Sequence, residues 1–348
     1  MSHAGFHVAI VGATGAVGEQ MLKTLDRLSF PIASMKLLSS ARSAGKKITF
    51  KNEELTVEEA TPESFEGIQL ALFSAGGSVS KALAKEAVKR GAIVVDNTSA
   101  FRMDKDVPLV VPEVNEHALH EHNGIIANPN CSTIQMVAAL EPLRRDYGLS
   151  RIVVSTYQAV SGAGVNAIDE MYEQTQQLLN EEEIEPKVLP VSGDKKHYQI
   201  AFNAVPQIDV FQENGFTYEE MKMINETKKI MEDESIKVAA TCVRLPVETG
   251  HSESVYVEVE KEGLDVAKVR SLLEEAPGVT LQDDPSNQVY PLASEAKGKD
   301  PVFVGRIRQD IDEPKGFHMW IVADNLLKGA ALNSVQIAFS LVKLGLLK

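Results

Sequence analysis

The sequence predicts an α/β protein in which a doubly wound parallel sheet is joined to an α+β part with a mixed sheet. Residues 1–130 alternate short, continuous apolar runs with helical patterns, as expected for parallel strands that are covered on both faces. Later residues include strands with one polar face, which are typical of a mixed or antiparallel sheet. The length of 348 residues favours two domains.

The first part is expected to contain six strands, each a short apolar run. They are Phe6–Val11, Met35–Leu38, Leu70–Phe73, Ile93–Val95, Leu109–Val111 and Ile125–Ala127. Val17, Met21 and Leu25 recur at helical spacing after the first run, and Ala82–Arg90 has a helical pattern after the third. This alternation of strands and helices predicts the doubly wound sheet.

The pattern changes after Cys131. Helices are expected at Ser132–Leu140, Ile168–Leu179 and, as one amphipathic segment, Asn325–Leu347. The expected strands are Ile152–Tyr157, Val238–Leu245, Val302–Arg308, Met319–Ala323 and the stretch in which Val255, Val257 and Val259 alternate with polar residues. We therefore predict that residues 1–130 and 325–348 form one domain and residues 131–324 the other.

Charge and cysteine content limit the classes of function. With 35 Lys and Arg against 49 Asp and Glu, the net charge is −14, which argues against nucleic-acid or anionic-membrane partners. Two cysteines are too few for a disulfide framework or a cysteine-rich metal site, and they fit a reducing compartment. Since neither a membrane span nor a signal peptide is visible, a cytoplasmic protein is expected.

A glycine turn between the first strand and its helix predicts a dinucleotide site. Gly12–Gly18 has the spacing G-x-x-G-x-x-G, in which backbone N–H groups and a helix N-terminus would face a pyrophosphate, as in Rossmann-type domains. The second strand ends in Ser39-Ser40-Ala41-Arg42-Ser43, where an NAD site would carry an acidic residue. Hydroxyls and a guanidinium suit a 2′-phosphate, so NADP is predicted. The alternatives are a ligand-free turn and an ordinary polar loop.

Of the two cysteines, Cys131 is the better nucleophile candidate. It follows an apolar strand and precedes a helix, and the positive end of a helix dipole favours the thiolate. Cys242 lies inside a strand pattern and is interpreted as a packing residue.

Several motifs together resemble the aspartate-β-semialdehyde dehydrogenase family, in its bacterial, Gram-positive-type branch. They are Gly12–Gly18, Asn128–Thr133, Gln158–Gly164, Arg244–Val247 with Gly250-His251, and Asp324–Ala331. The resemblance implies NADP-dependent conversion of aspartyl phosphate to aspartate semialdehyde and phosphate, or the reverse. Such a reaction serves lysine, threonine, methionine and diaminopimelate biosynthesis.

The resemblance also implies roles for individual residues. Cys131 matches the nucleophile, His251 the acid/base group, whose imidazole titrates in a suitable range, and Gln158 a residue that orients the intermediate. The substrate's charged groups are assigned to four further residues. Arg244 matches the carboxylate-binding residue, Arg102 and Lys222 phosphate-binding residues, and Glu219 the residue that binds the amino group, with the adjacent Glu220 as the alternative.

The residues expected to bind the coenzyme are chosen from their positions at the ends of predicted strands and from the family resemblance. It comprises Gly12, Thr14, Gly15, Ala16, Val17, Ser39, Ser40, Arg42, Ser43, Ser74, Ser161, Gly162 and Asn325. The resemblance further implies a homodimer, with a tetramer as an alternative, and a site in the cleft between the domains.

Competing interpretations remain at this point. The same chemistry on N-acetylglutamyl phosphate is one alternative, although its acylated nitrogen would not need Glu219. A non-catalytic NADP-binding redox sensor would have no use for His251 or Arg244. Glu219 and Lys222 could form an ordinary surface pair. The histidine-containing segment Glu116–His122 lacks metal-ligand spacing and is interpreted as a solvated polar helix, so no metal site is predicted.

Overall fold

The computed structural model describes residues 5–347, which divide into two compact units. The first unit contains the described residues up to Asn130 and those from Ala330 onward, and the second contains Cys131–Gly329. The predicted cut at Asn325 differs from this division by five residues. Asn325 belongs to the second unit because its side chain hydrogen-bonds Ser161 Oγ at 3.0 Å and the Gly250 N–H at 2.9 Å.

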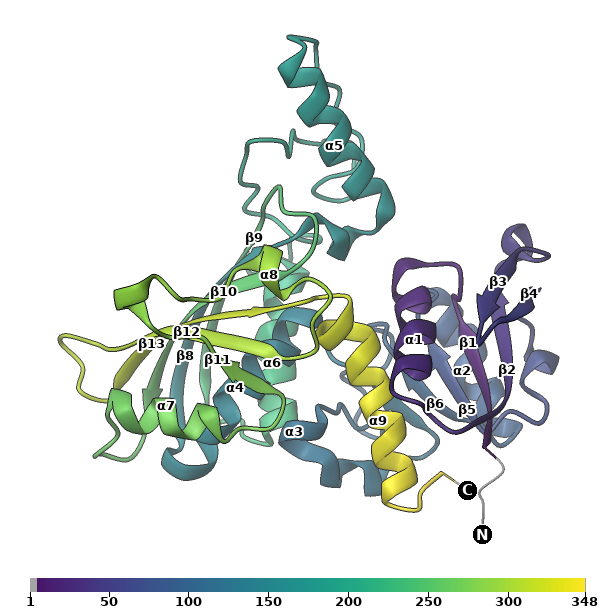
Figure 1. Ribbon diagram of the computed structural model, residues 1–348, viewed down its shortest axis with the longest axis horizontal. Coiled ribbons are helices and arrows are strands. Elements are labelled where there is room, and N and C mark those ends of the chain that lie inside the picture. The colour runs from purple at the N-terminus through teal and green to yellow at the C-terminus, as the bar shows by residue number, and fades with distance from the viewer. Residues whose placement is uncertain (1–4, 348) are drawn as a thin grey trace. The chain divides into compact units, whose positions relative to one another are not determined.

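The first unit contains a seven-stranded sheet in the order β3-β4-β2-β1-β5-β6-β7 (Figure 1). Its strands are β1 (Phe6–Val11), β2 (Ile32–Ser39), β3 (Lys47–Phe50), β4 (Glu53–Glu59), β5 (Leu70–Phe73), β6 (Ile93–Asp96) and β7 (Ile125–Ala127). All neighbours are parallel except β3 and β4. The chain runs outward from β1 in one direction and then restarts at β5 in the other. The doubly wound prediction is therefore confirmed.

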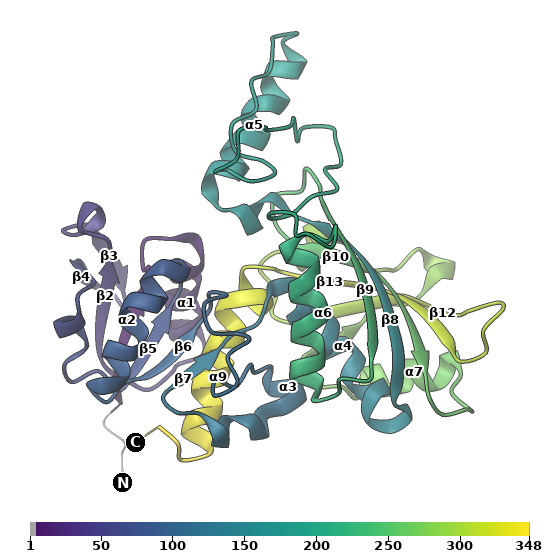
Figure 2. The same cartoon turned by 180° about the vertical axis from the view of Figure 1, so that it is seen from behind.

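Helices cover both faces of this sheet. Helix α1 (Ala16–Arg27) lies on one face and α2 (Gly77–Lys89) on the other, as the opposite views in Figures 1 and 2 show. Helix α9 (Leu332–Lys343) packs beside α1, although some 300 residues separate them. Phe30 and Phe339 meet edge to face here, with ring centroids 5.1 Å apart. Burial of this apolar surface attaches the C-terminal helix to the first unit.

Two details of the first unit differ from prediction. Leu109–Val111 is not a strand and forms only an isolated bridge to Ala127, because Pro108 and Pro112 flank it and Pro112 begins the short helix α3 (Pro112–Asn115). Strands β3 and β4 were not predicted. Strand β4 is mostly charged and buries only Val57 fully, and β3 has only four residues, so hydrophobic patterning does not reveal either strand.

The second unit contains a six-stranded sheet in the order β11-β12-β13-β10-β8-β9. Its strands are β8 (Leu149–Gln158), β9 (Lys237–Arg244), β10 (His251–Val259), β11 (Val279–Leu281), β12 (Val302–Gln309) and β13 (Gly316–Ala323). The pairs β8–β9 and β11–β12 are parallel and the others antiparallel, which confirms the mixed sheet. Along β10, Val255, Val257 and Val259 are buried and the residues between them are partly exposed, as predicted.

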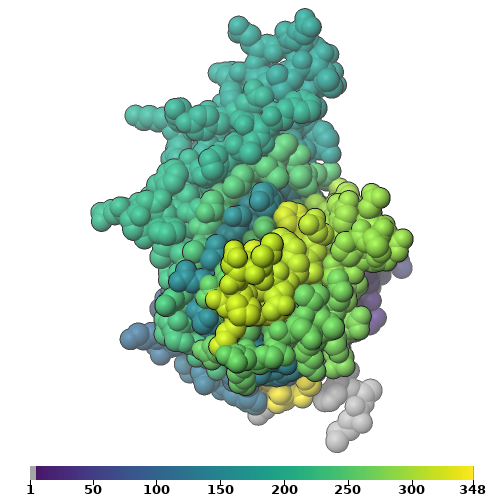
Figure 3. Space-filling model, turned by 90° about the vertical axis from the view of Figure 1, so that its left-hand side faces the viewer, coloured from purple at the N-terminus to yellow at the C-terminus, as the bar shows by residue number. Residues whose placement is uncertain are grey.

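Helices α4 (Cys131–Tyr147), α6 (Tyr218–Met231) and α7 (Val266–Glu274) pack on one face of this sheet. The short helix α8 (Ala293–Ala296) lies beside β13. Helix α5 (Val165–Leu179) and the chain that follows it project from the sheet as an arm, in teal at the top of Figures 1 and 3. No helix within residues 5–347 is long and apolar enough to cross a membrane.

The predicted C-terminal helix is interrupted. A π-helical turn occupies Leu327–Ala331 before α9 begins. The Asp324 side chain accepts hydrogen bonds from the N–H groups of Leu326 and Leu327, and the Gly329 N–H donates to the Asp324 carbonyl at 3.2 Å. These hydrogen bonds hold the beginning of the segment in a π-helical turn, which is wider than an α-helical turn. Amphipathic periodicity in the sequence does not predict such a turn.

Candidate active site

The glycine turn in the first unit is held by close backbone contacts. The N–H groups of Gly12 and Ala13 donate to the Leu38 carbonyl at 2.8 and 3.2 Å. Gly12 has a φ of +91°, and a Cβ at Gly18 would lie 2.2 Å from the Gly12 carbonyl oxygen. The glycines therefore permit both the left-handed turn and the tight seating of α1, which begins directly after Gly15.

A pocket of about 650 Å³ opens beside this turn. Its lining includes eight of the predicted coenzyme residues: Gly12, Thr14, Gly15, Ser39, Ser40, Arg42, Ser43 and Ser74. Thr14 and Ser39 hydroxyls lie 3.1 Å apart, which joins the turn to the end of β2. The predicted residues Ala16 and Val17 are in α1 and do not line this pocket, and Ser161, Gly162 and Asn325 belong to the second unit.

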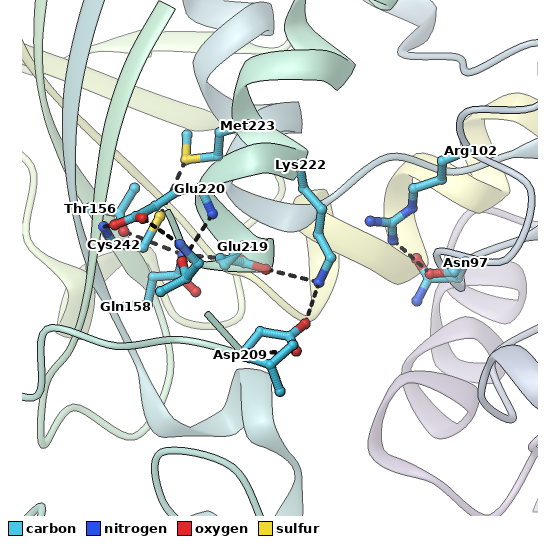
Figure 4. Close-up of polar contacts among 12 residues, drawn as sticks. Asn97, Arg102, Thr156, Gln158, Asp209, Glu219, Glu220, Lys222, Met223 and Cys242 are labelled. Atoms are coloured by element: carbon cyan, nitrogen blue, oxygen red, sulfur yellow. Dashed lines mark hydrogen bonds and ion pairs between the residues drawn. The ribbon is translucent and has the colours of Figure 1, made fainter. Parts of the chain in front are cut away.

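Arg102 is the candidate substrate residue of the first unit. It is buried, and its Nε donates to the Asn128 carbonyl at 2.9 Å while Nη2 donates to the Asn97 carbonyl at 3.0 Å (Figure 4). These two carbonyls fix the direction of the guanidinium. The sequence does not predict that Asn97 and Asn128 hold Arg102, because they do so through main-chain carbonyl groups.

Cys131 is the first residue of α4 and is half-buried. A Cβ at Gly329 would lie only 2.7 Å from the Cys131 Cβ, so the π-helical turn packs directly against the cysteine. Burial lowers the pKa of Arg244, and electrostatic interactions with Glu219 and then with Cys131 oppose this shift. Cys131 therefore lies at a helix N-terminus within electrostatic range of a guanidinium, and both features favour a thiolate in general.

The backbone of Ala159 holds two predicted side chains. Its carbonyl accepts from Arg244 Nη1 at 2.7 Å, and its N–H donates to His251 Nδ1 at 3.1 Å. Arg244 lies at the end of β9 and His251 at the start of β10, and both are buried. A Cβ at Gly162 would lie 3.0 Å from Arg244 Nη1 and 3.3 Å from His251 Nε2. Both side chains therefore pack closely against Gly162, and a side chain at this position would crowd them.

The charge state of His251 differs from the sequence expectation. Burial and then the positive charge of Arg244 lower its pKa to about 3, although Glu219 opposes them. The ring is therefore neutral at physiological pH, whereas the sequence suggested an imidazole that titrates near neutrality.

A chain of polar contacts joins Gln158 to Lys222 (Figure 4). Gln158 Nε2 donates to Glu219 Oε1 at 3.2 Å, and Lys222 Nζ lies 3.1 Å from Glu219 Oε2. Lys222 Nζ also donates to Asp209 Oδ2 at 3.0 Å and lies 4.6 Å from the centre of the Tyr218 ring. The sequence did not reveal Asp209, because it lies in an irregular segment without a motif.

Glu220 has a structural role that separates it from Glu219. Its carboxylate accepts from the Thr217 N–H at 2.7 Å, which completes a capping box at the start of α6, and from the Cys242 N–H at 3.0 Å. Cys242 is fully buried, and burial raises the pKa of its thiol well above the usual range. Its interpretation as a packing residue is confirmed.

Two buried residues near the site were not predicted. Gln135, one helical turn after Cys131, donates from Nε2 to the His251 carbonyl at 3.2 Å and so ties α4 to β10. Glu253, two residues after His251, is fully buried, and burial raises its pKa well above the usual range. Burial therefore disfavours the charged form of this carboxyl group. The only sequence signal was that Glu253 occupies a position on the buried face of the strand, in phase with Val255 and Val257.

Glu116–His122, the histidine-containing segment, forms a 3₁₀-helix over Glu116–Glu121 in which Ala118 and Leu119 are buried. The segment is thus half-buried and not fully solvated. Within residues 5–347, no group of three or more His, Cys, Asp or Glu side chains is placed to hold a metal ion.

A doubly wound sheet with a glycine turn, followed by a mixed-sheet unit that gathers Cys131, Arg244 and His251, defines a two-domain dehydrogenase of the dinucleotide-binding class. Two family models agree: "Semialdehyde dehydrogenase, NAD binding domain" matches residues 7–122, and "Semialdehyde dehydrogenase, dimerisation domain" matches residues 140–328. The chain belongs to the aspartate-semialdehyde dehydrogenase family, and it is an oxidoreductase of amino-acid biosynthesis.

Individual relatives match over nearly the whole chain. The aspartate-semialdehyde dehydrogenase of Bacillus subtilis is 71% identical over 98% of this chain and 99% of its own length. A crystal structure of aspartate semialdehyde dehydrogenase II from Vibrio cholerae, complexed with ASA, is 48% identical with a TM-score of 0.92, covering 97% of this chain and 98% of that one. The Candida albicans enzyme with NADP is 26% identical with a TM-score of 0.75, covering 97% of this chain and 98% of that one.

Proposed function

We propose that this chain catalyses the reversible, phosphate-dependent and NADP-dependent interconversion of L-aspartyl 4-phosphate and L-aspartate 4-semialdehyde, through a thioacyl intermediate on Cys131. The reaction would supply lysine, threonine, methionine and diaminopimelate biosynthesis. One observation carries the proposal: a cysteine at the start of α4 lies within electrostatic range of the buried Arg244, in the unit that also holds Gln158, Glu219 and His251.

Cys131 is the proposed nucleophile. Its thiolate sulfur attacks the acyl carbon of aspartyl phosphate, a C–S bond forms, and the C–O bond to phosphate breaks with its electron pair leaving on phosphate. When bound, the nicotinamide dinucleotide supplies the hydride that reduces the acyl carbon. The C–S bond then breaks, its electron pair returns to sulfur, and the aldehyde is released. The NADP complex of the Candida relative and the ASA complex of the Vibrio relative support this choice of ligands.

Recognition of the substrate is assigned to charged side chains. The Arg244 guanidinium suits a carboxylate, since its planar fork can donate two hydrogen bonds. Glu219, which contacts both Gln158 and Lys222, is assigned to the amino group, and Glu220 is not, because both of its oxygens already serve α6 and β9. Lys222 and Arg102 are assigned to phosphate.

The residues of the first unit fit an adenosine with a 2′-phosphate. The pocket beside the glycine turn is large enough for part of a dinucleotide, and exposed Arg42 stands at its rim with Ser40 and the buried hydroxyl of Ser39. The acidic residue that would favour NAD is absent from the end of β2, although Glu59 lines the pocket from β4. Ser161, Gly162 and Asn325 of the second unit are assigned to the nicotinamide end.

We also propose a homodimer that forms through the second unit, with a tetramer as the alternative. The "dimerisation domain" match supports it, as does the half-exposed apolar face of the second sheet, which presents Val153, Tyr157 and Trp320. Neither Cys131 nor Cys242 forms a disulfide bond within residues 5–347, which agrees with a reducing, cytoplasmic location.

One assay separates the proposal from its rivals. The purified enzyme is given aspartate semialdehyde, NADP and inorganic phosphate, and coenzyme reduction is followed by absorbance. We expect reduction that requires phosphate. N-acetylglutamate semialdehyde serves as the matched alternative substrate. Preference for it would identify the sister reaction, and no turnover of either aldehyde would favour a non-catalytic redox sensor.

A further inference from the structure

Arg102 is held by two main-chain carbonyl groups that belong to neighbouring strand ends. Asn97 directly follows β6 and Asn128 directly follows β7, and these two strands pair in parallel. The Asn97 carbonyl accepts from Arg102 Nη2 at 3.0 Å, and the Asn128 carbonyl accepts from Arg102 Nε at 2.9 Å. The direction of the guanidinium therefore depends on the spacing between these two carbonyl groups.

The side chains of the same two asparagines fix that spacing. Asn128 Nδ2 donates to Asn97 Oδ1 at 2.7 Å, which is a short hydrogen bond between the two strand ends. Asn128 is fully buried, and its N–H donates to the Asp96 carbonyl at 2.8 Å. The main chain and the side chain of Asn128 thus each join the end of β7 to the end of β6.

A third asparagine fixes the orientation of the Asn128 amide. Asn333, the second residue of α9, is fully buried, and its Nδ2 donates to Asn128 Oδ1 at 2.7 Å and to the Val110 carbonyl at 3.0 Å. A main-chain carbonyl can only accept, so Val110 sets which end of the Asn333 amide faces Asn128. Asn128 must then present its oxygen to Asn333 and its nitrogen to Asn97. The three amides form one chain of hydrogen bonds with a single direction.

We propose that Asn128 and Asn333 are positioning residues for the phosphate subsite, because their amide chain holds the two carbonyl groups that orient Arg102. This inference rests on the proposed function, which assigns Arg102 to phosphate. A guanidinium binds phosphate well only when its N–H groups face the phosphate oxygens, so its direction matters as well as its charge. Loss of the chain should therefore weaken phosphate binding without removing any group that touches phosphate.

Burial of an asparagine does not by itself require such a chain. A buried amide needs hydrogen-bond partners, and nearby main-chain groups can supply them. Asn115, another buried asparagine of the first unit, bonds the main chain of Leu109 and Val111, at most six positions away. The bond between Asn128 and Asn333 instead joins residues 205 positions apart, and the chain continues to the residues that hold Arg102.

The first test follows the exchange of the Arg102 Nε–H proton in the whole enzyme without substrate. Arginine is labelled with nitrogen-15, and the Arg102→Lys variant identifies the Arg102 signal. We expect exchange to be at least about tenfold faster in Asn128→Ala and in Asn333→Ala than in wild type. Unchanged exchange in both variants would overturn the proposal.

Ser340→Ala is the matched control for both tests. It also removes a buried side-chain hydrogen bond from α9, the one that Ser340 Oγ donates to Glu116, but it lies outside the amide chain. Alanine is a strong helix former, so α9 is expected to remain folded in Ser340→Ala and in Asn333→Ala alike. The Arg102 exchange rate in Ser340→Ala should equal that of wild type.

Kinetics supply the second test. We expect KM for phosphate to rise about five- to tenfold in Asn128→Ala and in Asn333→Ala. The values of kcat, KM for NADP and KM for aspartate semialdehyde should stay within about twofold of those of Ser340→Ala. Equal changes in all three KM values, or a fall in kcat alone, would show a merely structural role and contradict the proposal.

The double variant that carries both alanines separates one chain from two independent effects. If Asn333 acts through Asn128, the double variant raises KM for phosphate no further than Asn128→Ala alone. Effects that multiply would overturn the proposed chain. An absence of phosphate-dependent turnover in wild type would contradict the proposed function instead, and the exchange rates of Arg102 would still decide whether the chain holds this arginine.

Discussion

Gly329 offers a sharp test of how the π-helical turn positions Cys131. The change is Gly329→Ala. Its new Cβ would lie 2.7 Å from the Cys131 Cβ and 3.2 Å from the Cys131 Cα, whereas carbon atoms in contact normally lie ~3.5–4.0 Å apart. The cysteine or the turn must therefore move by about 1 Å.

A displacement of this size at the nucleophile is expected to be costly for turnover. Misplacement of a reacting group by about 1 Å can lower the rate by about 10²-fold. Overpacking of this kind costs about 1–3 kcal/mol of stability. We therefore expect kcat for aspartate semialdehyde to fall by about 10²-fold, with NADP binding nearly unchanged because the glycine turn lies in the other unit.

The assay measures kcat, the NADP dissociation constant and the midpoint of thermal unfolding for each variant. Gly193→Ala is the matched control, since a Cβ there meets no atom within 4 Å. If Gly329→Ala turns over within about twofold of Gly193→Ala while remaining folded, the idea that this contact positions Cys131 is refuted.

Four further predictions follow from individual side chains. Arg42→Ala should raise KM for NADPH about 10–100-fold, because a charge-assisted hydrogen bond to the 2′-phosphate is lost, and it should leave KM for NADH unchanged. Equal effects on both coenzymes would contradict a 2′-phosphate contact. Glu219→Gln should raise KM for aspartate semialdehyde more than it lowers kcat, and an unaltered KM would remove Glu219 from amine recognition. Iodoacetamide followed by peptide mass mapping should modify Cys131 and spare Cys242, which is fully buried. Because the pKa of His251 is lower in the folded protein than in the unfolded chain, the unfolded chain binds a proton that the folded protein does not. The contribution of His251 to the free energy of unfolding therefore falls as pH drops from about 6.5 toward about 3. His251→Asn should flatten that part of the unfolding midpoint against pH, and an unchanged slope would count against a neutral buried ring.

Much of the fold could be predicted because its core strands carry continuous apolar runs. The buried strands β1, β5 and β6 match their predicted positions to within one residue, since both faces of each are covered. Strand β3 lies at the sheet's edge and has only four residues, and its neighbour β4 is mostly charged, so no hydrophobic pattern marks either strand. The π-helical turn before α9 depends on hydrogen bonds from Asp324, which periodicity does not encode.

Only those residues of the candidate site that stand in recognisable sequence motifs could be predicted from the sequence. Cys131, Arg244 and His251 stand in such motifs. The Ala159 backbone fixes both Arg244 and His251, and a main-chain donor or acceptor leaves no mark on the sequence. Gln135 reaches the site through tertiary packing alone, since 116 positions separate it from the residue whose carbonyl it contacts. The neutral state of His251 likewise follows from burial, which composition does not show.

The most direct test of the central proposal is the mass of the enzyme after it meets aspartyl phosphate without coenzyme. Intact-protein and peptide mass spectrometry after rapid acid quenching would detect an acyl group on the enzyme. We predict one aspartyl group per chain, located on the peptide that contains Cys131, with one equivalent of phosphate released and no acyl group in Cys131→Ser held under the same conditions. Phosphate release without an acylated Cys131, or an acyl group on another residue, would contradict the thioacyl mechanism.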